Sequence, residues 1–114
     1  MPDLRVYGVS AAGDRTFYFP FLDPDSSAGD YLTSTPTLSV ANDLAIYKDG
    51  VDTAVGTATL SWVGDGYGKI VLDAAHLQAK IVVAIIIDAT ATKEWVDTSI
   101  IIHTGGDDNA LHSG

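Results

Sequence analysis

Apolar and polar residues alternate along much of the chain, and this pattern predicts β-strands. The clearest case is residues 57–63, where Ala58, Leu60 and Trp62 alternate with threonine and serine, and residues 44–48 show the same period. A period of two is typical of strands that bury one face of a sheet. Segments of similar character predict further strands at residues 4–9, 16–22, 36–40, 67–72 and 94–103.

One segment is apolar without interruption. Residues 81–87 read Ile-Val-Val-Ala-Ile-Ile-Ile and are almost all β-branched. Such side chains favour strands, and a strand without polar positions is typical of the buried centre of a sheet. We therefore expect residues 81–87 to form the central strand, buried on both faces. The substitution Ile85→Ala should then cost roughly 2–5 kcal/mol of stability.

Turn-forming residues separate these segments. Asp49-Gly50 is the strongest hairpin signal, because glycine accepts the positive φ angle that a tight turn requires. Residues 64–66 (Gly-Asp-Gly) predict a second turn, and residues 23–30 predict a loop. The chain is thus expected to fold as short strands joined by tight connections.

Two residues predict local features of the sheet. Pro20 lacks a backbone N–H, so the strand at residues 16–22 should lie at a sheet edge or break there. Asp73 is a favourable helix N-cap, and the alanines and leucine after it predict one or two helical turns at residues 73–79. Only a short helical element is therefore expected among the strands.

About seven short strands with one short helical turn favour an all-β fold, an immunoglobulin-like β-sandwich. A small, partly open barrel is the alternative. Residues 1–104 are expected to form this single domain. Residues 105–114 lack periodicity and bulk, which predicts a flexible C-terminal tail, and residues 1–9 are expected to act as a second terminal arm.

Composition narrows the function classes. Among 114 residues, 15 are acidic and 6 basic, and the net charge of −9 repels phosphate backbones and anionic membranes. We therefore expect neither nucleic acid nor a membrane as a partner. The lack of cysteine excludes disulfides and thiolate metal ligands. Charged residues make up only 18% of the chain, below the roughly 25% of average domains, which suits a surface with extensive protein contacts.

The sequence contains no segment that predicts export or a membrane span. The longest apolar run is far shorter than the roughly 20 residues that a spanning helix needs. The first residues lack a cationic stretch followed by an apolar one, which a secretion signal requires. We expect a soluble chain made in the cytoplasm.

Residues that commonly carry catalysis are present without a recognisable arrangement. Ser10, Ser39, Ser61 and Ser99 fall in or beside predicted strands, and no Gly-x-Ser-x-Gly nucleophile motif occurs. The histidines are His76, His103 and His112. They share neither a helix face nor a metal-binding spacing. We therefore expect no catalytic residues, no metal site and no cofactor.

One acidic cluster has two interpretations. Asp23, Asp25 and Asp30 resemble in spacing the start of a calcium-binding loop, whose oxygen ligands alternate along the chain. However, Ala28 stands where such a loop has glycine, and Ser34 stands where it has glutamate. Capping of turns by these carboxylates is the interpretation that we favour, and a looser calcium loop is the alternative.

The glycines of residues 64–68, Gly-Asp-Gly-Tyr-Gly, resemble a phosphate-binding loop only superficially. A phosphate loop needs a following helix whose amino terminus faces the anion. A predicted strand follows here instead, so we interpret the segment as a hairpin turn.

Aromatic residues cluster within residues 15–22, Arg-Thr-Phe-Tyr-Phe-Pro-Phe-Leu. Base stacking would need basic neighbours, and Arg15 alone is present. We expect these rings to form core on one face of the strand and a docking edge for another subunit on the other. The candidate interface residues are Phe17, Tyr18, Phe19, Phe21, Trp62, Tyr67 and Trp95.

Several short motifs follow one another along the chain. They are Phe-x-Asp at residues 21–23, Ala-Ile-Tyr-Lys-Asp-Gly at 45–50, Thr-Ala-Thr-Leu at 57–60, Gly-Asp-Gly-Tyr-Gly at 64–68, Leu-Asp-Ala-Ala-His-Leu at 72–77, Ile-Ile-Asp at 86–88 and Trp-Val-Asp-Thr-Ser-Ile-Ile-Ile-His-Thr at 95–104. Their order and spacing, over residues 15–104, resemble a pattern of small β-sandwich accessory proteins of tailed bacteriophages.

The resemblance implies a structural virion protein. Such modules serve as capsid decoration (cement) proteins, which stabilise the head shell through the major capsid protein, commonly as homotrimers at threefold positions. The alternative is a tail, fibre or baseplate module that binds a host receptor or carbohydrate. Exposed Trp62, Tyr67 or Trp95 in a groove would favour this alternative, because sugars stack on aromatic faces. No catalytic residue comes with the resemblance.

Overall fold

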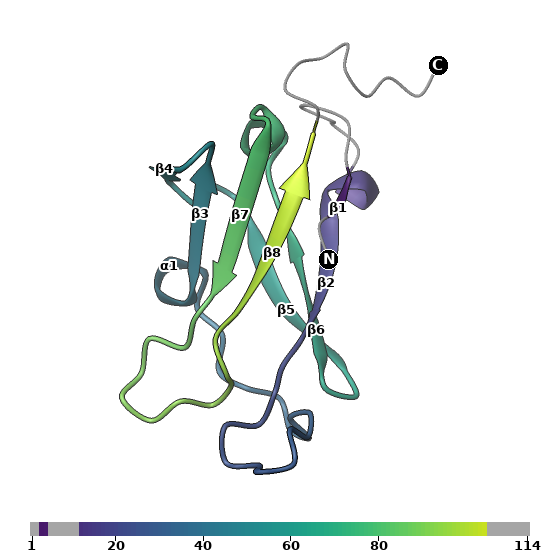
Figure 1. The fold of residues 1–114 in the computed structure, drawn as a ribbon, viewed down its shortest axis with the longest axis vertical. Helices are drawn as coiled ribbons and strands as arrows, with labels where there is room; N and C mark the ends of the chain where they lie inside the picture. Colours follow the sequence, from purple (N-terminus) through teal and green to yellow (C-terminus); the bar gives the residue numbers. More distant parts are fainter. Residues whose placement is uncertain (1–2, 5–11, 105–114) are drawn as a thin grey trace.

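Two β-sheets stacked face to face form the fold, and the computed structural model describes residues 3–4 and 12–104 of the chain (Figure 1). The first sheet has the strand order β1 (Asp3–Leu4), β8 (Thr98–His103), β7 (Ile81–Ile86), β3 (Leu44–Lys48) and β4 (Val51–Thr53). The second has the order β2 (Thr16–Pro20), β6 (Tyr67–Val71) and β5 (Thr59–Gly64). The helical elements are η1 (Ala12–Arg15), α1 (Val40–Asp43) and η2 (Ala74–Leu77). All strand pairs are antiparallel except β1 with β8.

The predicted all-β sandwich is confirmed. The sequences β8-β7-β3-β4 and β2-β6-β5 reproduce the order of a variable-type immunoglobulin sandwich, in which the second, fifth and fourth strands of the basic fold form one sheet. The strands form two separate sheets, so the alternative of a partly open barrel does not describe this chain. The hallmark cysteine pair of immunoglobulin domains is absent from the sequence, so no disulfide joins the two sheets.

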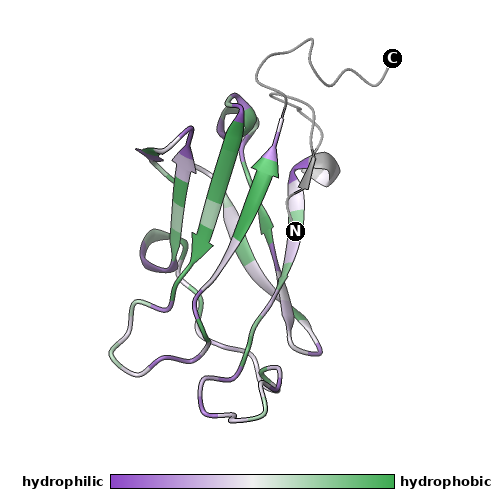
Figure 2. Cartoon of the chain, viewed as in Figure 1, coloured by the Kyte–Doolittle hydropathy of each residue, from purple (hydrophilic) through white to green (hydrophobic). Residues whose placement is uncertain are grey.

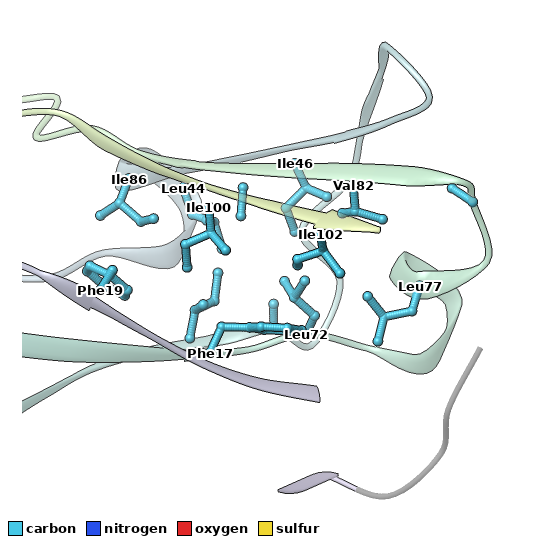
Figure 3. Packing of buried hydrophobic residues seen from close by; sticks show 14 of the residues in the cluster. Phe17, Phe19, Leu44, Ile46, Leu72, Leu77, Val82, Ile86, Ile100 and Ile102 are labelled. Carbon is cyan, nitrogen blue, oxygen red and sulfur yellow. The ribbon is translucent and has the colours of Figure 1, made fainter. Parts of the chain in front are cut away.

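The core lies between the two sheets and consists of the inward side chains of both (Figure 3). Phe17 and Ile70 enter it from the three-stranded sheet, while Ile46, Val82 and Ile102 enter from the five-stranded sheet. Each is at most 1% exposed. Burying an aliphatic or phenyl side chain of this size contributes roughly 1.5–3 kcal/mol, so these contacts are what join the sheets.

Strand β7 occupies the centre of its sheet, as predicted, but the prediction that both of its faces are buried is wrong. Val82, Ala84 and Ile86 are buried against the core. On the other face, Ile85 is half-buried and Ile81 is 41% exposed, because no described element covers the outside of this sheet. The cost of about 2–5 kcal/mol that the sequence predicts for Ile85→Ala applies to fully buried side chains. Ile85 is only half-buried, so this prediction does not apply to it.

The predicted hairpin at Asp49-Gly50 is confirmed and joins β3 to β4. Both residues have positive φ angles, 50° and 85°, as a type I′ turn requires. The alternation pattern does not predict β4, because this strand has three residues and one apolar side chain, Val51. The chain then crosses to the other sheet, where residues 59–64 pair with β6.

Other local predictions are confirmed. Strand β2 lies at the edge of its sheet and ends at Pro20, whose missing N–H a central strand could not tolerate. The helical turn after Asp73 is a 3-10 helix over Ala74–Leu77. The predicted terminal arm at residues 1–9, apart from β1, and the predicted tail at residues 105–114 lie outside the described residues.

The strand predicted at residues 36–40 is wrong, and the strand predicted at residues 94–103 is wrong in part. Residues 36–39 form no strand, because the N–H groups of Thr37 and Ser39 donate to the side-chain carboxylates of Glu94 and Asp43 instead of a neighbouring strand. Strand β8 begins at Thr98 rather than at Glu94. Upstream of it the chain turns inward, burying Trp95 completely.

Candidate functional site

The two longest connections meet at one end of the sandwich. Residues 21–39 join β2 to α1, and residues 87–97 join β7 to β8, and both lie at the lower end of Figure 1. Long connections with little secondary structure of their own are uncommon in compact domains and are frequently functional. In variable immunoglobulin domains, the loops at these two topological positions form part of the antigen-binding end. This loop end is therefore the first place to look for a binding site.

A cleft of about 360 Å³ opens between these loops. Its lining residues are Asp23, Pro24, Asp25, Leu32, Thr33, Ser34, Thr35, Pro36, Lys93 and Glu94. The volume lies at the lower end of the range for small-molecule sites. The walls offer carboxylates and hydroxyls, with Leu32 and Pro36 as the apolar part, so the cleft suits a small polar ligand rather than an apolar one.

The acidic residues of the first wall cap turns. Asp23 Oδ1 accepts a hydrogen bond from the N–H of Asp25 at 2.9 Å. The hydroxyl of Ser26 donates to Asp30 Oδ2 at 3.0 Å and accepts from the N–H of Asp30 at 3.1 Å. Asp30 does not line the cleft, and no group of three metal-binding side chains occurs among the described residues. The geometry thus favours turn capping over the looser calcium loop.

The opposite wall is held by a buried carboxylate that the sequence analysis missed. Asp88 is 2% exposed, and its two oxygens accept from the N–H of Thr90 at 2.9 Å, the hydroxyl of Thr90 at 2.6 Å and the N–H of Glu94 at 2.5 Å. Burial alone would raise the pKa of Asp88, but these hydrogen bonds outweigh it and hold the pKa below its ordinary value. Glu94 in turn accepts from the N–H of Thr37 at 2.5 Å, which links the two loops.

His76 has a structural environment. Its Nδ1 accepts from the N–H of Asp73 at 3.0 Å, so its Nε2 carries the proton and donates to the carbonyl of Ala54 at 2.9 Å. The side chain is 3% exposed. Both ring nitrogens are thus engaged with the backbone, and the ring fastens η2 to the segment after β4.

The remaining candidates for catalysis are dispersed. His103 stands opposite Ile81 on the outer face of the five-stranded sheet, and Ser99 lies on the same face of β8. Ser61 belongs to β5 in the other sheet, and Ser39 precedes α1. His112 and Ser10 lie outside the described residues. The described serines and histidines therefore occupy different parts of the molecule rather than one site.

Four of the seven candidate interface rings lie in the core. Phe17, Phe19, Phe21 and Trp95 are at most 4% exposed, and the ring centroid of Phe21 lies 5.0 Å from that of Phe19 and 5.2 Å from that of Trp95. Trp62 is half-buried and packs on Phe21 at 5.8 Å between centroids. These rings hold the sandwich together, and the four buried ones have no surface to offer a partner in this fold.

The other two rings lie together at the surface. Tyr18 and Tyr67 are 60% and 40% exposed, and their rings meet edge to face with 6.1 Å between centroids. Lys69 and Ser61 are cross-strand neighbours on the same outward face, which also carries the exposed Val63. We call these five residues the tyrosine face. The alternation of Tyr18 with buried Phe17 and Phe19 is the sequence signal for it.

A second exposed surface lies on the opposite sheet. Outward side chains of β3, β7 and β8 form it, and these strands are hydrophobic over much of their length (Figure 2). We call this surface the apolar face, and it comprises Ala45, Tyr47, Ile81, Val83, Ile85 and Ile101. The sequence analysis missed it because the uninterrupted apolar segment was interpreted as buried on both sides.

Comparison with known protein families, with curated proteins and with solved structures finds no match for this chain. Within the part of the chain that the structure describes, no helix is long and apolar enough to span a membrane.

Proposed function

We propose that this chain is a structural virion protein of a tailed bacteriophage, a capsid decoration protein that docks on the head shell through the tyrosine face. The observation that carries the docking surface is the exposed Tyr18–Tyr67 pair. The resemblance in motif order over residues 15–104 supports the virion assignment. An all-β sandwich is the fold that the resemblance implies.

The chemistry of the tyrosine face suits docking on another protein without a change in the fold of this chain. Tyrosine is enriched at protein interfaces, because its ring buries apolar area while its hydroxyl keeps a hydrogen bond. Tyr18 and Tyr67 project from rigid paired strands, so little conformational freedom is lost when they bind. Lys69, opposite Tyr18, adds a single cation to a chain of net charge −9. A shell subunit with an acidic or hydroxyl-rich pocket beside an apolar patch would complement this face.

Binding to phage shells that lack decoration tests the proposal. The chain should bind such shells, and the double variant Tyr18→Ser/Tyr67→Ser should bind at least about 10-fold more weakly, because central interface tyrosines commonly contribute more than about 1.4 kcal/mol. The control is Val51→Ser, since Val51 is 65% exposed and lies on β4 of the other sheet. Equal binding of the double variant and the control would refute docking through this face.

The loop-end cleft favours a second function, a tail or baseplate module that binds a host carbohydrate or receptor. Its carboxylates and hydroxyls could bind sugar hydroxyl groups. The described lining contains no aromatic ring, and Trp62 and Trp95 pack in or against the core, so aromatic stacking would contribute nothing there. Specific retention on host cells, lost in Asp25→Asn and kept in the double tyrosine variant, would move the assignment to this function.

A further inference from the structure

The apolar face is an apolar surface that the described residues leave uncovered. Ile101 of β8 is 43% exposed and Ile81 of β7 is 41% exposed. Between and beside them lie the half-buried Val83, Ile85 and Tyr47. In Figure 2, β7 is hydrophobic along its whole length, although only every second side chain of it points into the core. Contiguous exposed aliphatic surface of this kind marks a place of association.

We propose that this face is covered by the same face of a second copy of the chain, related by a twofold axis parallel to β7. The first argument is its composition. Homodimer interfaces are more apolar than the interfaces of non-obligate complexes. The apolar face resembles a homodimer interface in composition, whereas the more polar tyrosine face resembles the interface of a non-obligate complex. The two surfaces therefore suit different partners.

Charge gives the second argument. Each chain carries a net charge of −9, so two copies repel one another over most of their surfaces. The six side chains of the apolar face are uncharged, and Asp52, the cross-strand neighbour of Tyr47, stands at its margin on β4. A like-charged copy can approach closely only through such an uncharged surface. A partner of opposite charge would instead be drawn to the acidic loops and turns.

The cross-strand rows give the third argument, because they are complementary to themselves. Tyr47, Val83 and Ile101 lie in one row across β3, β7 and β8. A twofold axis over β7 and parallel to it exchanges the positions of β3 and β8. Val83 then faces Val83 of the second copy, and Ile101 faces Tyr47 in both directions. Reciprocal contacts of this kind define a symmetric interface, and aligned face-to-face packing is a standard arrangement of β-sheets.

The size of the face predicts how tight the pairing is. Three strands of about six residues cover roughly 20 by 15 Å, given a rise of about 3.3 Å per residue and a spacing of about 4.8 Å between strands. This is smaller than the roughly 800 Å² per partner of a standard stable interface. We therefore expect a concentration-dependent dimer rather than an obligate one.

Pairing through the apolar face would also determine how the two tyrosine faces of a dimer are oriented. The tyrosine face lies on the outside of the other sheet, so in the dimer the two tyrosine faces point in opposite directions. Two shell subunits on either side could then be bridged by one dimer. The inference itself does not depend on the virion assignment, since it concerns the isolated chain. It replaces the threefold arrangement that the resemblance implies with a twofold one.

Sedimentation equilibrium of the full chain over a wide range of concentrations is the first test. We expect a monomer–dimer equilibrium, and Ile101→Glu should raise its dissociation constant at least about 10-fold by placing a carboxylate against Tyr47. Val63→Glu is the matched control, because Val63 is 42% exposed on the other sheet and the substitution changes the net charge equally. A monomer at every concentration, a trimer, or equal effects of both variants would overturn the proposal.

Crosslinking tests the symmetry without a substitution that adds charge. The chain has no cysteine, so Val83→Cys introduces a single thiol on the expected axis. A short bis-maleimide should join two copies efficiently, because the backbones of facing sheets lie about 10 Å apart. Val63→Cys should give little crosslinked dimer under the same conditions. Folding of each variant is checked by circular dichroism, and a folded Val83→Cys chain that crosslinks no better than the control contradicts the twofold arrangement.

Discussion

The carboxylate of Asp73 accepts two hydrogen bonds from Thr57, one from its N–H at 2.9 Å and one from its hydroxyl at 2.5 Å. Thr57 lies just before β5, and Asp73 lies between β6 and η2. With His76, which donates to the carbonyl of Ala54, Asp73 fixes the segment where the chain crosses from one sheet to the other. This segment has no strand partner of its own, so these side-chain contacts hold it in place together with the packing of Val55 and Ala58 on the core.

The Asp73–Thr57 contact should stabilise the fold in a pH-dependent way. The hydroxyl of Thr57 and, after it, the Thr57 N–H hold the pKa of Asp73 below its ordinary value, against the opposing effect of burial. A pKa lowered by folding means that the stabilisation is complete above the unfolded value, about 3.9, and is lost as the pH falls through the folded value. Thr57→Val should therefore cost about 1 kcal/mol at pH 7 and progressively less below pH 4.

Urea denaturation at a series of pH values measures this difference. Asp52→Asn is a suitable control, because Asp52 is exposed on the short edge strand β4 and takes no part in the contact between Asp73 and Thr57. A destabilisation of Thr57→Val that stays constant from pH 7 to pH 2 would show that the hydroxyl does not act through the ionised carboxylate.

Asp88 should govern the order of the loop that carries Glu94 and Lys93 to the cleft. The N–H groups of Thr90 and Glu94 donate to the two carboxylate oxygens of Asp88. Asp88→Asn replaces one of these oxygens with an N–H₂ group, which is itself a donor, so at least one buried donor loses its acceptor. We expect a loss of about 1–3 kcal/mol. Because hydrogen bonding outweighs burial and lowers the pKa of Asp88, the wild-type loop should also lose stability in acid, below the unfolded pKa of Asp.

Amide hydrogen exchange checks this prediction locally. The N–H of Glu94 should exchange faster in Asp88→Asn than in the wild type. The N–H of Ile46, on β3 between two paired strands, serves as the reference, because its exchange rate should change only as far as the global stability changes. Unchanged protection of Glu94 would mean that other contacts hold the loop.

The period of apolar residues predicted those strands whose two faces differ. Residues 44–48 match β3 because Leu44 and Ile46 are buried while Ala45 and Tyr47 are not. The same reasoning failed for residues 81–87, since a run that is apolar at every position contains no information about which face is covered. Only the arrangement of the other strands shows that the outer face of β7 has no layer over it.

The site residues were less predictable, for a related reason. Trp95 was expected at an interface, but it is fully buried and its Nε1 donates to the carbonyl of Ile86 at 3.3 Å, a contact between segments that only the closed β7–β8 loop brings together. Asp88 enters the sequence analysis only as the last residue of the Ile-Ile-Asp motif at residues 86–88, which does not predict its burial or its hydrogen bonds. Its role arises from loop N–H groups that fold back on it, and local propensity does not encode such contacts.

The two faces of β7 should respond differently to truncation. Ile86 is fully buried, so Ile86→Ala should cost about 2–5 kcal/mol. Ile85→Ala should cost clearly less when measured at concentrations where the chain is monomeric, because that side chain is only partly buried. Chemical denaturation of both variants gives the comparison, and equal costs would contradict the uncovered outer face.

Gly68 offers the sharpest test of how the aromatic core is packed. It lies in β6, and a methyl group on its Cα would collide with the ring of Phe21, lie 2.7 Å from the carbonyl oxygen of Ser61 and press on the ring of Phe19. The carbonyl belongs to the paired strand β5 and cannot move without breaking the ladder, so the strain falls on the backbone as well as on the rings. Gly68→Ala should therefore destabilise the fold by about 2–4 kcal/mol, within the range of severe overpacking.

Gly13→Ala is the control, because a methyl group there meets no atom within 4 Å. Chemical denaturation of both variants measures the two losses of stability. An equally small loss for Gly68→Ala would mean that the rings of Phe19 and Phe21 can move aside, which would contradict the tight packing of the aromatic core.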